Sequence, residues 1–121
     1  MRLLIVDDSM IIRNRIQRAM DFHHLEVVGV AANGLEAVDM VAEKKPHILT
    51  MDLTMPEMDG IECIESILKI DPNLVILVVS ALADKATAIE AIKKGAHGFV
   101  CKPFTEEELT TAINKLIARM K

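Results

Sequence analysis

The chain alternates short, strongly apolar runs with longer stretches in which apolar residues recur every three or four positions. Short apolar runs are typical of buried strands, and a period of three to four residues is typical of amphipathic helices. Turn residues such as Asn33-Gly34 and Asp71-Pro72-Asn73 separate the segments. We therefore expect strands over residues 2–6, 26–31, 48–52, 74–79 and 98–101, and helices that begin at Ser9, Leu35, Ile61, Asp84 and Thr105.

Strands that alternate with helices predict a doubly wound α/β fold, with a parallel sheet covered on both faces, as one domain over residues 1–121. The strand over 48–52 is apolar on both faces and belongs in the middle of the sheet, whereas the strand over 26–31 is expected at an edge. The apolar helix stripes should face the sheet: Leu35, Val38, Val41 and Ala42 in the second helix, and Ala88, Ile89, Ala91 and Ile92 in the fourth.

Polar side chains stand where the predicted strands end. Asp7 and Asp8 follow the first strand, Asp52 ends the central one, and Ser80 and Lys102 follow the last two. Each alone has an ordinary explanation, since an Asp often starts a turn and a Lys is usually a surface residue. Together they should meet at the carboxyl edge of the sheet, where α/β proteins of this kind bind ligands.

Composition narrows the function further. The net charge is -4 and both signs are interspersed, which argues against direct nucleic-acid binding. Because no apolar run is long enough for a membrane span and the N-terminus does not resemble a signal peptide, we expect a soluble, cytoplasmic protein. Cys63 and Cys101 are predicted to be small core residues, and the four histidines lack metal-like spacing.

Three neighbouring carboxylates repel one another and call for a cation. Oxygen ligands with room for water suit Mg²⁺, while Lys102 and the Ser80 hydroxyl suit a phosphoryl group. An Asp carboxylate can act as a nucleophile toward phosphorus. The residues alone therefore predict phosphoryl chemistry, with Asp52 as the candidate nucleophile.

These residues carry a resemblance to the receiver domains of response regulators, and in detail to single-domain chemotaxis receivers of the CheY type. The resemblance spans the whole chain, and such receivers have a flavodoxin-like sheet of order 2-1-3-4-5. The motifs that carry it are Ile5-Val6-Asp7-Asp8-Ser9, Met51-Asp52-Leu53-Thr54-Met55-Pro56, Asp59-Gly60, Val79-Ser80-Ala81 and Phe99-Val100-Cys101-Lys102-Pro103-Phe104.

The resemblance implies that Asp52 accepts a phosphoryl group from a histidine kinase. Mg²⁺ would be bound by Asp8, Asp52 and the Thr54 carbonyl, and by Asp7 through water. Ser80 and Lys102 would engage the phosphoryl group, Phe99 would be the switch, and the Lys102-Pro103 bond would be cis.

On this interpretation the chain is a monomer and not an enzyme, although it catalyses its own phosphorylation and dephosphorylation. Its further partners would be a downstream protein such as a flagellar motor switch protein, and a phosphatase. It departs from many chemotaxis receivers by having Phe99 for Tyr and Ser80 for Thr.

Two alternatives stay open from the sequence. A haloacid-dehalogenase-like phosphohydrolase would share the aspartyl phosphate, but its second Asp would fall on Thr54. A flavodoxin-like cofactor binder is opposed by the scarcity of aromatic residues, which are Phe22, Phe99 and Phe104 only. The sequence also leaves open whether a C-terminal effector was removed, which kinase and target are used, and how long the phosphoryl group lasts.

Overall fold

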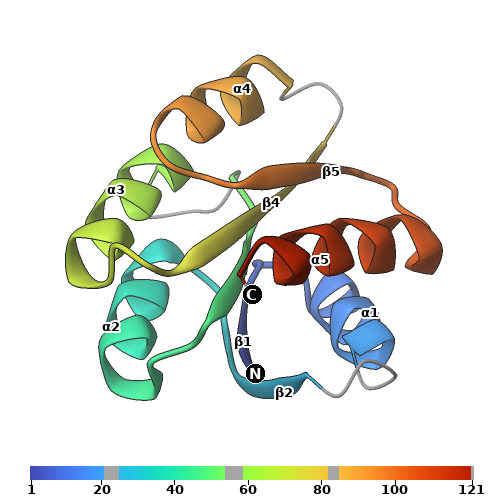
Figure 1. Ribbon diagram of the computed structural model, residues 1–121, viewed down its shortest axis with the longest axis horizontal. Coiled ribbons are helices and arrows are strands. Elements are labelled where there is room, and N and C mark those ends of the chain that lie inside the picture. Colours follow the sequence, from blue (N-terminus) through green and yellow to red (C-terminus); the bar gives the residue numbers. More distant parts are fainter. Residues whose placement is uncertain (21–24, 54–58, 82–84, 121) are drawn as a thin grey trace.

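A computed structural model describes residues 1–20, 25–53, 59–81 and 85–120 of the chain. Five parallel strands form one sheet in the order β2-β1-β3-β4-β5, with helices on both faces (Figure 1). The sheet order that the family resemblance implied is therefore confirmed. The elements are β1 Arg2–Val6, α1 Met10–Met20, β2 Glu26–Ala31, α2 Gly34–Lys44, β3 Ile48–Met51, α3 Gly60–Ile70, β4 Val75–Ala81, α4 Lys85–Lys93, β5 Gly98–Lys102 and α5 Glu106–Met120.

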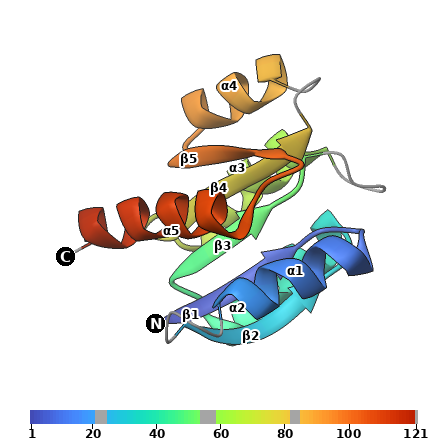
Figure 2. The same cartoon turned by 90° about the vertical axis from the view of Figure 1, so that its right-hand side faces the viewer.

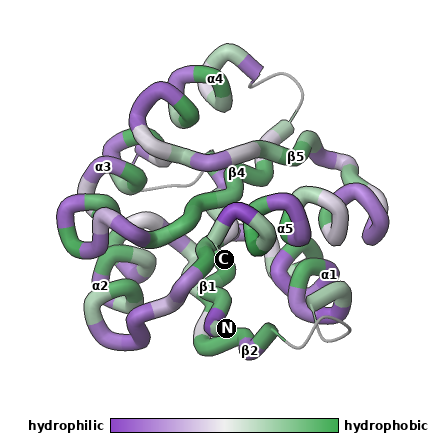
Figure 3. The backbone as a smooth tube through the Cα atoms, viewed as in Figure 1, coloured by the Kyte–Doolittle hydropathy of each residue, from purple (hydrophilic) through white to green (hydrophobic). Residues whose placement is uncertain are grey.

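The helices divide into two layers, seen from two sides in Figures 1 and 2. Helices α1 and α5 cover one face of the sheet, and α2, α3 and α4 cover the other. Each layer closes over its own apolar cluster. The strands are almost continuously hydrophobic, whereas the helices mix both kinds of residue (Figure 3). This is the pattern of a parallel sheet that is buried on both sides.

Alternation along the central strands decides which side chains share a face. In β3, Leu49 and Met51 belong to the cluster under α2, α3 and α4, whereas Ile48 belongs to the cluster under α1 and α5. In β1, Leu3 and Ile5 also face α1 and α5. Because the side-chain period of a strand is two, residues two positions further along point the same way.

Two predicted helix faces are wrong in part. Ile89 and Ile92 of α4 are 45% and 42% exposed, and Leu35 of α2 is 51% exposed. Helix α4 instead buries Ala88 and Ala91. Small side chains let a helix approach the sheet closely, and the neighbouring isoleucines are then rotated to the outside. In α2 the buried residues are Gly34, Ala37 and Val41, and Ala42 is exposed.

Strand ends also differ by a residue or two from those predicted. Strand β4 continues to Ala81, so Ser80 lies within it, and β5 includes Lys102. Strand β3 ends at Met51, one residue before Asp52. Asp84, the predicted start of the fourth helix, lies outside the described residues.

The start of α3 packs directly against the segment that follows Asp52. Asp59 caps the helix, with its Oδ1 accepting a hydrogen bond from the Ile61 N–H at 3.0 Å. A Cβ atom on Gly60 would lie 2.7 Å from the Leu53 Cα atom. Only glycine permits this approach of two backbones, so Gly60 fixes the path of the chain beside the site.

The opposite, amino edge of the sheet is held by two histidines. The Nδ1 atom of His47 accepts a hydrogen bond from the Arg2 N–H at 2.9 Å, and the His47 N–H donates to the Arg2 carbonyl. His97 makes the same pair of bonds with Ile76. These histidines therefore anchor the starts of the strands. Among the described residues, no helix has the length and apolar character needed to span a bilayer.

Candidate functional site

Asp52 continues the central strand by one residue and stands at the carboxyl edge of the sheet. Its N–H donates to the Val6 carbonyl at 2.9 Å, which extends the pairing of β1 with β3. The side chain is buried, with 2% of the residue exposed. A carboxylate is rarely buried to this degree unless it has partners.

Asp7 occupies the equivalent position after β1 and is also buried. Its N–H donates to the Ala31 carbonyl, and its Oδ1 accepts from the Ser9 N–H at 2.8 Å. Ser9 in turn accepts from the Ile12 N–H through its hydroxyl, at 3.3 Å, as in an N-cap. The residue that caps α1 therefore holds the Asp7 carboxylate in place.

Asp8 is exposed and completes the acidic cluster. Ligand oxygens of Asp7, Asp8 and Asp52 lie within 4.8 Å of one another. The donors are all oxygens, two of them from buried residues at strand ends, which is the donor set that a hard divalent cation prefers. The cluster therefore fits a metal ion, as the sequence predicted.

Lys102 reaches the same point from the end of β5. Its ammonium lies 3.0 Å from Asp7 Oδ2 and 3.5 Å from Asp52 Oδ2. The bond to Pro103 is cis, as expected. The sequence placed Lys102 at this edge as a partner for a phosphoryl group. In the structure its ammonium pairs with the carboxylates of Asp7 and Asp52.

Burial and charge oppose each other in this group. Burial raises the pKa of Asp7, and the Ser9 N–H and the Lys102 ammonium only partly offset it. For Lys102, burial lowers the pKa, but Asp7 and Asp52 outweigh this, so that its pKa is raised. The ammonium is therefore firmly protonated, whereas the ionised Asp7 depends on it.

Ser80 lies on β4, the neighbour of β3, and Phe99 lies on β5, the strand that ends at Lys102. Ser80 is buried, and its hydroxyl donates to the Ala81 carbonyl at 3.2 Å. It is paired with Cys101 of β5, two residues from Phe99 on that strand. Phe99 is partly buried against the cluster under α2, α3 and α4. Ser80 and the predicted switch residue Phe99 therefore lie on adjacent, paired strands.

Residues 3–114 match the family of response regulator receiver domains. The chain is 49% identical over 115 residues to the chemotaxis protein CheY of Thermotoga maritima, and the alignment covers 95% of this chain and 96% of that protein. The chain belongs to the response regulator receiver family. The receiver is also 41% identical over 116 residues to the chemotaxis protein CheY of Bacillus subtilis, covering 96% of this chain and 97% of that protein.

The fold of this receiver is shared with solved relatives. The response regulator domain of Thermotoga maritima CheB superposes with a TM-score of 0.87 at 35% identity, covering 99% of this chain and 96% of that one. The family match favours the receiver interpretation over both alternatives, the phosphohydrolase and the flavin-type binder.

Some parts of the site were not foreseen. Sequence analysis gave Arg13 no role, yet its guanidinium donates to the Asp7 carbonyl at 2.9 Å. The Asp7-Asp8-Ser9 sequence before an apolar helix carried the signal for the cap that Ser9 forms. Cys63 is buried as predicted, but Cys101 is only partly so. Thr54, whose carbonyl the resemblance implied as a metal ligand, lies outside the described residues.

Proposed function

We propose that this receiver accepts a phosphoryl group on Asp52 from a histidine kinase and passes the signal to a protein target, in chemotaxis. The observation that carries the proposal is the buried Asp52 carboxylate with two further carboxylates within 4.8 Å and the Lys102 ammonium at 3.5 Å. The similarity to two proteins named chemotaxis protein CheY supports the pathway.

Asp52 is the acceptor in this proposal because of its place in the sheet. It follows the central strand β3, which lies between β1, followed by Asp7, and β4, which carries Ser80. In the transfer, an Asp52 oxygen forms a bond to phosphorus while the bond from phosphorus to the kinase imidazole nitrogen breaks, and that nitrogen takes up a proton as it leaves. Lys102 and the Ser80 hydroxyl then contact the phosphoryl oxygens.

Asp7, Asp8 and Asp52 are the residues that would hold Mg²⁺, and the Thr54 carbonyl stays a predicted fourth ligand. When bound, the ion neutralises charge on the transferring phosphoryl group. The ammonium of Lys102 pairs with Asp7 and Asp52 in the structure. To contact a phosphoryl group on Asp52, it would have to turn away from Asp7.

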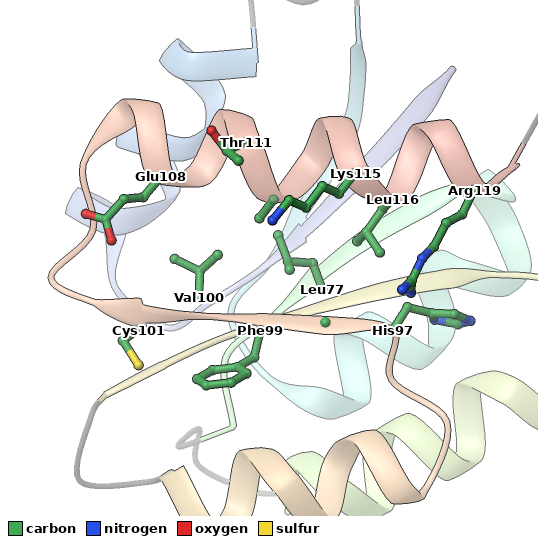
Figure 4. A pocket seen from close by; sticks show the side chains of 12 residues that line it. Leu77, His97, Phe99, Val100, Cys101, Glu108, Thr111, Lys115, Leu116 and Arg119 are labelled. Atoms are coloured by element: carbon green, nitrogen blue, oxygen red, sulfur yellow. The ribbon is translucent and has the colours of Figure 1, made fainter.

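A pocket of about 470 Å³ between β5 and α5 supplies a surface for the target (Figure 4). Leu77, Val100 and Leu116 give it an apolar floor, and Lys115 and Arg119 make one end basic. Phe99 belongs to the same strand but points away from α5, toward the other side of β5. A change in the packing of Phe99 would reshape β5 and, with it, this pocket.

Phosphorylation by a small-molecule donor tests the acceptor. We expect acetyl phosphate with Mg²⁺ to add one phosphoryl group, measured by intact-protein mass spectrometry, and Asp52→Asn to abolish the addition. Asp39→Asn removes an exposed carboxylate from α2 and should leave labelling unchanged. Excess chelator or Asp8→Ala should suppress it. Full labelling of Asp52→Asn would show that the acceptor is another residue, and full labelling in chelator would remove the metal from the proposal.

A further inference from the structure

Two buried side-chain polar atoms in the described part of the chain have no hydrogen-bond partner, namely Asp7 Oδ2 and Thr50 Oγ1. Asp7 Oδ2 is compensated by its ion pair with Lys102. Thr50 is fully buried in the middle of β3, and its hydroxyl has no such compensation among the described residues. An unpartnered hydroxyl two residues before the proposed phosphoacceptor calls for an explanation.

The two atoms belong to the same corner of the sheet. Thr50 is paired with Ile5 of β1, and Asp7 lies two residues beyond Ile5. Ile48 and Ile5 both face α1 and α5, so alternation places Thr50, Asp52 and Asp7 on that face as well. From ordinary strand spacings, the Cα atoms of Thr50 and Asp7 are roughly 8 Å apart. One bridging water spans a hydroxyl and a carboxylate at such a separation.

The hydroxyl carries a cost in the resting state. An unsatisfied buried hydroxyl destabilises the folded protein, because the group loses its hydrogen bonds to water. Valine has nearly the same shape and would remove this cost, and the neighbours of Thr50 in the ladder, Ile5 and Leu77, are apolar. The Thr50 hydroxyl therefore makes no hydrogen bond within the described residues of the unphosphorylated site. This favours a role for the hydroxyl in the phosphorylated site.

We propose that Thr50 is a positioning residue for phosphorylation, and this inference rests on the proposed function. When Lys102 turns from Asp7 to the phosphoryl group, Asp7 Oδ2 loses its ion pair with the ammonium. The Thr50 hydroxyl then donates, through one bridging water, to that oxygen and keeps the Asp7 carboxylate oriented. A water at this place would have three possible partners, the Thr50 hydroxyl and the carboxylates of Asp7 and Asp52, which is enough to retain it.

Binding of beryllofluoride, a mimic of the aspartyl phosphate, tests this role in the intact chain. We would measure its affinity in the presence of Mg²⁺ by titration calorimetry, and the Tm of each free protein. Thr50→Val should raise the Tm of the free protein by about 3 °C, because it removes an unsatisfied hydroxyl. The same variant should weaken beryllofluoride binding about fivefold, equivalent to about 1 kcal/mol for one hydrogen bond.

Two further variants separate the hydroxyl from packing. Thr50→Ser keeps the hydroxyl and should bind beryllofluoride like the wild type, even though its lost methyl group lowers the Tm. Ile48→Val, on the same face of the same strand, should lower the Tm and leave the affinity unchanged.

Equal affinity of Thr50→Val and wild type would overturn the proposal, as would a lower Tm of free Thr50→Val, because the hydroxyl would then have a partner at rest. Failure of the wild type to bind beryllofluoride would instead refute the proposed function itself.

Discussion

Lys102 provides the sharpest test of the electrostatics of the site, through Lys102→Met. The substitution keeps most of the side-chain volume and removes the ammonium that lies 3.0 Å from Asp7 and 3.5 Å from Asp52. Both carboxylates are buried, whereas a fifth of the Lys102 side chain remains exposed. We therefore expect the free energy of unfolding at neutral pH, in the absence of divalent cations, to fall.

The size of the loss follows from the burial of the pair. Breaking a buried ion pair costs about 3 to 5 kcal/mol, and the partial exposure of Lys102 places this one near 3 kcal/mol. Its dependence on pH follows from Asp7, whose pKa is already raised by burial in the folded protein. Without the ammonium that pKa rises further, so the folded state of the variant is favoured at acid pH and loses stability as the pH rises through this pKa.

Urea unfolding followed by circular dichroism measures the effect at about pH 4.5, close to the ordinary range of a carboxyl group, and at about pH 7.5. The deficit of Lys102→Met relative to wild type should be small at the lower pH and largest at the higher one. Lys69→Met, which removes an exposed charge from α3, should show neither effect, and Lys102→Arg should recover part of the loss. An equal deficit at both values would mean that packing, not charge, is lost, and the reasoning would fail.

Other predictions concern the backbone beside the site and the route to the target. Gly60→Ala should lower the free energy of unfolding by about 2 kcal/mol, because its Cβ would meet the Leu53 backbone. Gly98→Ala is the control and should not lower it, because its Cβ would make only ordinary contacts. Equal urea midpoints of Gly60→Ala and the wild type would refute the close approach. Phe99→Ala should keep phosphorylation but lose most of the phosphate-dependent gain in target affinity, typically about 1 to 3 kcal/mol for coupled sites, whereas Phe99→Tyr should keep both. Titration calorimetry with a target peptide measures this gain, and a full gain in Phe99→Ala would exclude the ring from the switch.

Most of the sheet could be predicted from the sequence because its strands are buried on both faces. The polar residues Asp7, Asp52 and Ser80 interrupt or end apolar runs, so their place at one edge follows from strand direction alone. The end of β4 was less predictable. Hydrophobicity stops at Val79, but pairing with Cys101 and Lys102 carries the strand on to Ala81. The end of β4 is set by backbone hydrogen bonds to β5, and the sequence of β4 alone does not predict these bonds.

Helix orientation and side-chain pairing were the parts that the sequence could not determine. In α4, alanines and isoleucines make the helix apolar on more than one side, and the closeness of its packing selects Ala88 and Ala91 over Ile89 and Ile92. The position of Lys102 at the end of the last strand is compatible with either a phosphate or a carboxylate partner, so the sequence does not decide between them. The unpartnered hydroxyl of Thr50 was likewise hidden, because a threonine in a strand is ordinary in any sequence.

The shared face of Asp7 and Asp52 limits where the length of this chain can vary. A single residue inserted within β3 would shift its register and turn Asp52 toward α2 and α3, on the other side of the sheet from its partners. A residue added to the turn at 71–74, at the amino edge, leaves every strand end where it is. Natural insertions and deletions among relatives are thus expected in the amino-edge turns, and grafted peptides or reporter tags would be tolerated there before anywhere else.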